Sequence, residues 1–138
     1  MNQRVRSILG VVAGFIAASA VMMVFEAING HVIYPELGQA AAKVKDPGQM
    51  RALMATVPAG AMAVVLAGWA VGAFVGGWVA QRIGRGDAGR SGVVLGILLT
   101  AAGIANNLMI PPPLWFWVAG MLVLLPGAWL GARAGVRR

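Results

Sequence analysis

The stretch Pro58–Ala80 reads PAGAMAVVLAGWAVGAFVGGWVA and contains no charged residue. A helix over this stretch, with a rise of 1.5 Å per residue, crosses the roughly 30 Å hydrocarbon core of a bilayer. Three further apolar stretches have similar lengths, and they run over Ile8–Ile28, Gly92–Ile110 and Leu114–Ala132. The sequence therefore predicts an all-α membrane protein with four transmembrane helices.

The composition agrees with this class and leaves little material for chemistry. Hydrophobic residues make up 59% of the chain and charged residues 11%, against ~25% charged in a typical soluble domain. The mean hydropathy is +0.80. The 138 residues suffice for one domain, 1–138, and with no cysteine, one histidine and four acids we expect no catalytic residues, no metal site and no cofactor. The protein is predicted not to be an enzyme.

The positive charges gather at one end of the predicted spans. The net charge is +7. Eight of the eleven basic residues flank the spans on one side, and they are Arg4, Arg6, Arg82, Arg85, Arg90, Arg133, Arg137 and Arg138. Only Lys43, Lys45 and Arg51 lie on the other side. This is the positive-inside pattern. It predicts a multi-pass membrane protein with cytoplasmic N- and C-termini, and it argues against a nucleic-acid partner.

The N-terminal stretch has some features of a signal peptide. Met1–Ser7 is basic, and Ala18-Ser19-Ala20 has the small residues of a cleavage site. The apolar run, however, continues through Val21–Phe25 and is too long for a signal core. We therefore expect a first helix that is retained.

The two halves of the sequence share motifs at matching depths. GVVAG at Gly10–Gly14 corresponds to GVVLG at Gly92–Gly96. GGWVAQRIG at Gly76–Gly84 corresponds to GAWLGARAG at Gly127–Gly135. Both copies begin on the same side, so we expect two parallel-repeat helical hairpins, 7–84 and 91–138, related by an axis along the membrane normal.

The two predicted hairpins differ in their outer connections. The second connection is only Pro111-Pro112-Pro113, whereas the first extends from about Gly30 to Val57. Within the longer one, Asp46 reads as an N-cap before Pro47, and Gln49 completes a capping box. Apolar residues then recur at helical spacing, at Met50, Leu53, Met54 and Val57. The pattern predicts a short amphipathic helix that either lies on lipid or caps the bundle.

Small residues at four-residue spacing predict where the helices pack. Helices in a membrane associate through close packing, because lipid tails are as apolar as leucine. The predicted packing positions are Gly68, Gly72 and Gly76 on the second span and Gly127 and Gly131 on the fourth. These stripes serve either packing within a four-helix bundle or a homo-oligomer. Membrane lipids are expected partners of such a chain, and its protein partners are unknown.

Polar residues converge at one depth in the outer part of the predicted bundle. Glu26, the one acid within a span, lies about 28 Å along the first helix, and Asn107 lies about 24 Å along the third. Asn29 and Asn106 are near neighbours of these two, and His31 lies just above. We therefore predict a polar cluster that comprises Glu26, Asn29, His31, Asn106 and Asn107.

Three functions fit this cluster. In the first interpretation, the cluster stabilises the fold, with Glu26 hydrogen-bonded to asparagine amides and helix ends, and the protein has a structural or accessory role. Alternatively, it is an ion or proton site in a small transporter or channel that uses Glu26 with Asn106 and Asn107. In the third interpretation, it binds a lipid, a small molecule or the helix of a partner protein. The structural role is the first expectation, and transport is the second.

Several segments of the chain carry a resemblance. They are Glu26, His31 and Tyr34-Pro35, then Gly72–Trp78, Ala102–Asn107, Ile110-Pro111 and Trp115–Trp117. With these segments the chain resembles a group of short, uncharacterised bacterial four-helix inner-membrane proteins with no assigned activity. The resemblance implies the topology and a bacterial origin. The chain is also similar in size and span number to small multidrug-resistance transporters, which carry a glutamate in their first helix. Here Glu26 lies near the outer end of the helix rather than at mid-membrane, so no residue role is carried over. Fluoride channels resemble it in span number alone.

Overall fold

The computed structural model describes all 138 residues, and every regular element in it is helical. Four helices are long: α1 (Gln3–Ile28), α4 (Ala59–Gly84), α5 (Ala88–Met109) and α6 (Leu114–Ala134). Between α1 and α4 lie a π-helical turn, η1 (Asn29–Ile33), and two short helices, α2 (Pro35–Ala42) and α3 (Pro47–Met54). The four long helices are long and apolar enough to cross a membrane, which confirms the four predicted spans.

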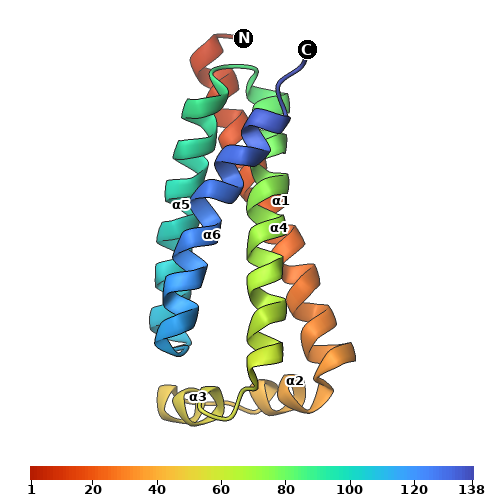
Figure 1. Ribbon diagram of the computed structural model, residues 1–138, viewed down its shortest axis with the longest axis vertical. Helices are drawn as coiled ribbons and strands as arrows, with labels where there is room; N and C mark the ends of the chain where they lie inside the picture. The colour runs from red at the N-terminus through yellow and green to blue at the C-terminus, as the bar shows by residue number, and fades with distance from the viewer.

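The four long helices form one elongated bundle (Figure 1). Both chain termini lie at one end of it, together with the α4–α5 connection, and we call this the terminal end. The opposite end carries α2, α3 and the α5–α6 connection, and we call it the loop end. Helix α4 is central, because it packs most extensively on α1 and next on α6, while α5 packs mainly on α6.

Helices α1 and α4 touch backbone to backbone near the terminal end. A Cβ atom added at Gly76 would lie 2.6 Å from the Gly14 carbonyl oxygen and 2.8 Å from the Cβ atom of Ala18. The same addition at Gly72 would lie 2.9 Å from the Ala18 carbonyl oxygen, and at Gly68 2.7 Å from the Phe25 Cβ. The glycine stripe of α4 therefore faces α1 within the same chain.

The glycines of α6 lie against another face of α4. A Cβ at Gly127 would lie 3.1 Å from the Ala73 Cβ, and one at Gly131 would overlap the Phe74 carbonyl oxygen. Helix α4 in turn presents Gly77 to the Ala128 backbone. Small residues on two faces of α4 thus allow two helices to approach it closely at once. A homo-oligomer would have to use surfaces other than these stripes.

Polar contacts hold the α4–α5 connection at the terminal end. Gln81 is buried, and its Nε2 donates to the Gly86 carbonyl oxygen at 2.9 Å while its Oε1 accepts from the Ser91 hydroxyl at 3.0 Å. Arg85 adopts a left-handed conformation that ends α4, and the Asp87 carboxylate accepts from the Arg90 amide to begin α5. The chain therefore reverses in a short, well-bonded turn.

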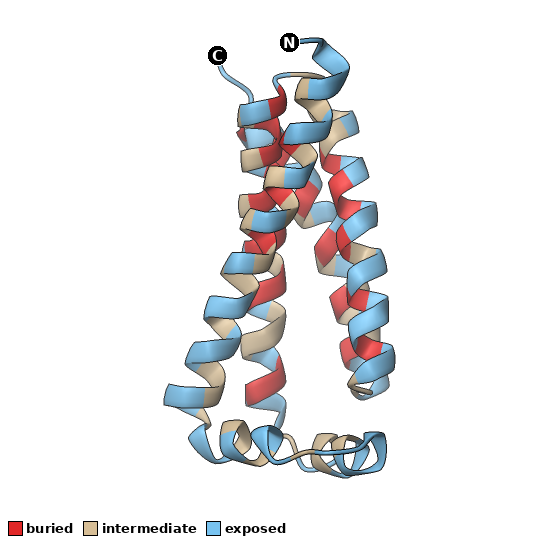
Figure 2. Ribbon diagram, turned by 180° about the vertical axis from the view of Figure 1, so that it is seen from behind, coloured by how far each residue is buried: buried red, intermediate tan, exposed pale blue.

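The two helix pairs, α1 with α4 and α5 with α6, diverge toward the loop end (Figure 1). Figure 2 shows the same arrangement from behind, with the buried residues on the surfaces where the helices face one another. Helices α2 and α3 run crosswise to the bundle at this end. The bundle is therefore narrow at the terminal end and open at the loop end.

The long connection contains more structure than the sequence predicted. Helix α3 begins where expected, with the Asp46 carboxylate accepting from the Gln49 amide at 2.8 Å. The Gln49 side chain accepts from the amide of Lys45 at 2.8 Å rather than from that of Asp46, so the capping box is shifted by one residue. Neither η1 nor α2 was predicted. Helix α2 begins with Pro35 at its first turn, where proline is favoured, and continues into the helix-forming run Ala40–Ala42.

We predict that Gly76→Ala destabilises the protein, because the added methyl group meets the α1 backbone in a tightly packed interface. Overpacking of this kind costs about 1–3 kcal/mol. The matched control is Gly84→Ala on the same helix, where the nearest atom to an added Cβ is the Ser7 Cα at 3.5 Å, an ordinary contact distance. Unfolding in maltoside micelles titrated with sodium dodecyl sulfate measures both variants. Equal stability of the two variants would contradict the close α1–α4 contact.

Candidate functional site

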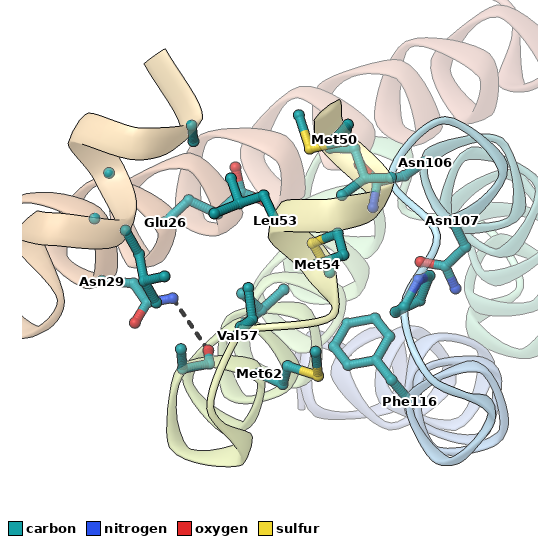
Figure 3. A pocket seen from close by; sticks show the side chains of 18 of the residues that line it. Glu26, Asn29, Met50, Leu53, Met54, Val57, Met62, Asn106, Asn107 and Phe116 are labelled. Atoms are coloured by element: carbon teal, nitrogen blue, oxygen red, sulfur yellow. Dashed lines mark hydrogen bonds between the residues drawn. The ribbon is translucent and has the colours of Figure 1, made fainter. Parts of the chain in front are cut away.

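A pocket of about 490 Å³ occupies the loop end of the bundle (Figure 3). Its lining comes from all seven helical elements, including the crosswise helices α2 and α3. In Figure 3, Glu26 and Asn29 lie on one side and Asn107 and Phe116 on the other, with Leu53 and Met54 of α3 between them. The pocket thus forms where the two helix pairs diverge and α3 lies across the end of the bundle.

The walls of the pocket are mainly apolar. Helix α3 contributes Met50, Leu53 and Met54, and the larger apolar residues from the rest of the chain are Leu37, Val57, Met62, Val65, Ile110 and Phe116. Phe116 is held in place by Trp69, whose ring meets it edge-on with centroids 5.3 Å apart. Methionine side chains are unbranched and flexible, so this wall can adapt to different shapes.

All five residues of the predicted polar cluster line this one pocket. Glu26 comes from the last turns of α1, Asn29 and His31 from η1, and Asn106 and Asn107 from the end of α5. The exposure of these side chains differs. Glu26, His31 and Asn106 are exposed, Asn29 is half-buried, and Asn107 is only 1% exposed.

Glu26 is the only acidic residue that lines the pocket, and no lysine or arginine lines it. Its carboxylate makes no hydrogen bond and no ion pair with any other residue of the chain. Glu26 and His31 are the two side chains here that commonly bind metals, and no third joins them in a metal-binding group. The pocket therefore offers one unpaired carboxyl group.

Asn29 connects η1 to α4. Its Nδ2 donates to the Ala61 carbonyl oxygen at 3.1 Å, while its Oδ1 is buried without a partner. One of the two amide hydrogens of Asn29 is thus used within the protein. Its buried Oδ1 remains available as a hydrogen-bond acceptor.

Asn107 is the most unusual residue of the site. Both its Nδ2 and its Oδ1 are buried, and neither has a hydrogen-bond partner in the protein. Leaving buried polar groups unpaired costs about 1–3 kcal/mol. A complete amide that lines an apolar pocket in this state can both donate to and accept from a molecule within that pocket.

The sequence predicted the polar residues of this site but not its walls. The face formed by Met50, Leu53, Met54 and Val57 was visible as a helical pattern, and capping of the bundle was one of its two interpretations. Nothing in the sequence linked this face to Glu26 or Asn107. Helix α2, which adds Leu37, Gly38, Ala41 and Ala42 to the lining, had no predicted counterpart.

Comparisons with protein-family models, with curated proteins and with solved structures find no match to this chain.

We predict that Asn107→Leu stabilises the protein, because an apolar side chain of similar size removes two unpaired polar atoms from the interior. The expected gain is about 1 kcal/mol or more in the free energy of unfolding. Asn106→Leu is the matched control, since the neighbouring side chain is exposed and should change stability by less than about 0.5 kcal/mol. Unfolding of both variants in mixed micelles gives the comparison. A clear loss of stability in Asn107→Leu would show that the Asn107 amide has structural partners after all.

Proposed function

We propose that this chain is a non-enzymatic bacterial inner-membrane protein that binds a lipid or a small amphiphilic molecule in the pocket at its loop end. One observation carries the proposal: the pocket combines apolar walls with an unpaired carboxylate and unpaired buried amide atoms. Ligand pockets in proteins are mostly apolar, with a few well-placed polar groups, and measure about 300–1,000 Å³. The volume of about 490 Å³ lies within this range.

The structural interpretation of the cluster loses support from the same geometry. It required the Glu26 carboxylate to accept hydrogen bonds from asparagine amides or helix ends, and Glu26 accepts none. Asn107, which would be expected to join such a network, is unpaired as well. Residues kept only for stability would be expected to satisfy one another.

Proton- or ion-linked transport by Glu26 with Asn106 and Asn107 is the second candidate. Glu26 favours it, because an unpaired carboxylate at membrane depth is typical of transport sites. The pocket, however, is lined only by residues from the loop-end half of the bundle. Passage to the terminal end would require the close contacts of Gly14 with Gly76 and of Gly77 with Ala128 to open.

The proposed orientation places the terminal end in the cytoplasm and the pocket in the outer half of the membrane. Eight arginines at or near the terminal end support it by the positive-inside rule. Trp78 and Trp129 also lie near this end. The Arg82 guanidinium stacks over the Trp78 ring at 5.0 Å from the ring centroid, and the Arg133 guanidinium stacks over the Trp129 ring at 4.9 Å. Such tryptophans are typical of the membrane–water boundary.

A duplicated helical hairpin is the proposed origin of the bundle. The two cation–π pairs occupy corresponding positions of the repeated motif, with nearly the same geometry. Gly77 and Ala128 also correspond in that motif, and they meet where α4 contacts α6, as expected for residues near a pseudo-twofold axis. The short helices α2 and α3 would then be an elaboration of the first hairpin, with α3 laying its apolar face on the pocket.

We predict that Leu53→Trp weakens binding of a neutral amphiphile by at least about tenfold, because the larger side chain occupies the pocket. Ala52→Trp is the matched control, since Ala52 is exposed on the same helix and does not line the pocket. Scintillation proximity with the purified protein in maltoside micelles and a tritiated monoacylglycerol measures both. Identical, non-saturable signals from wild type and both variants would overturn the binding proposal.

We predict opposite sidedness for the two ends of the bundle. The chain has no cysteine, so single cysteines can be placed at the exposed positions Gln39 and Val136. In intact spheroplasts a membrane-impermeant maleimide should label Gln39→Cys, and it should label Val136→Cys only after permeabilisation. Labelling of both from outside would contradict the proposed topology.

A further inference from the structure

We propose that the pocket selects organic cations: amphiphiles whose head group is an ammonium or similar donor-rich cation and whose body is hydrocarbon. This inference rests on the proposed binding function and names its ligand class. Membrane amines of this kind come from two sources, an aminolipid or a free amphiphilic amine, and both present the same chemistry to the pocket.

The charge of the pocket points to a cation. Glu26 is its one acidic residue, and no lysine or arginine lines the pocket to neutralise its carboxylate. The basic residues of the same connection, Lys43, Lys45 and Arg51, all lie outside the lining. An anionic head group would meet an unpaired carboxylate of like sign in an apolar surrounding, where repulsion is strong.

The free hydrogen-bonding atoms also favour a donor-rich head group. Asn29 uses one of its two amide hydrogens on the Ala61 carbonyl, and its buried Oδ1 is free to accept. The Glu26 carboxylate can only accept when ionised. Asn107 adds a third acceptor, its Oδ1, together with one amide donor group. Among Glu26, Asn29 and Asn107, four oxygen atoms are free to accept, and only the Asn107 amide nitrogen is a donor atom without any partner. This excess of acceptors complements an ammonium group, which has donors and no acceptor.

The walls suit a hydrocarbon body without fixing its shape. Met50, Met54 and Met62 line the pocket together with Leu53 and Phe116. Flexible methionine side chains repack around different ligands, and they are frequent at surfaces that bind several partners. The expected selectivity is therefore for the charge of the head group, with tolerance for the chain.

The test compares three tritiated probes with the same chain: dodecylamine, dodecanol and dodecanesulfonate. Each is titrated in scintillation proximity against wild type, Glu26→Gln and the control Glu36→Gln in maltoside micelles. Glu36 lies on α2 outside the pocket lining, so it matches the chemical change without touching the site. Because each probe partitions into the micelle alike for all three proteins, the ratio of variant to wild-type affinity isolates the contribution of Glu26.

We expect Glu26→Gln to lower the affinity for dodecylamine by about tenfold or more, since it removes a charge-assisted hydrogen bond. The affinity for dodecanol should change by less than about twofold, and Glu36→Gln should leave both unchanged. Dodecanesulfonate should bind wild type most weakly. Equal losses for dodecylamine and dodecanol, or no loss for either, would overturn cation selection.

The two proposals fail in distinguishable ways. Suppose that dodecanol binding is saturable and is lost in Leu53→Trp, while Glu26→Gln leaves the affinity for dodecylamine unchanged. The pocket then binds amphiphiles but does not select cations. If no probe binding depends on Leu53, both proposals are wrong. Where dodecylamine binding does depend on Glu26, competition with lysophosphatidylethanolamine identifies the source of the ligand. Displacement of dodecylamine by this lipid supports an aminolipid. Failure of the lipid to displace dodecylamine supports a free amine.

Discussion

The contact between the backbones of α1 and α4 at Gly14 and Gly76 is the constraint from which the rest of the bundle follows. In hydrocarbon, helices gain nothing by hiding apolar side chains from their surroundings, so they associate only where their surfaces fit closely. Glycine and alanine let the helix axes approach. Helix α4 has such residues on two faces, toward α1 at Gly76 and toward α6 at Gly77, and it therefore becomes the central helix.

The same packing explains why a pocket forms at the opposite end. Along the α1–α4 contact, the residue facing each α4 glycine grows from Gly14 through Met22 to Phe25 toward the loop end. Along the α4–α6 contact, Gly77 and Ala128 give way to Trp69 against Gly120 and Phe116. Larger side chains hold helices farther apart. The increase in residue size along the α4–α6 contact accounts for the divergence of the two pairs (Figure 1), and α3 lies across the end of the bundle where they diverge.

The sequence was sufficient for those features that depend on one helix at a time. Apolar length gave the four spans, and the rise per residue placed Glu26 and Asn107 at a common depth, where the structure brings them into one pocket. Features that depend on how helices rotate and separate could not be obtained in this way. Asn106 and Asn107 are adjacent and chemically identical, yet Asn106 is exposed and Asn107 is buried. The helical turn η1 and helix α2 were missed because their short, mixed composition carries no strong periodicity.

The state of Asn107 supports the proposal that the loop end of the bundle binds a ligand. A buried amide with no partner makes the folded protein less stable than an apolar residue would in the same place. An unpaired Glu26 at membrane depth carries a further cost. Functional sites are where proteins commonly retain such locally unfavourable residues, because the groups that would satisfy them belong to a ligand. The terminal end shows the contrast: buried Gln81 uses both its donor and its acceptor within the protein, on Gly86 and Ser91. Three of the four buried side-chain polar atoms without a partner lie at the loop end, on Asn29 and Asn107, and the fourth is Arg82 Nε. The loop end therefore has free polar atoms around the pocket that the proposed cationic amphiphile would occupy.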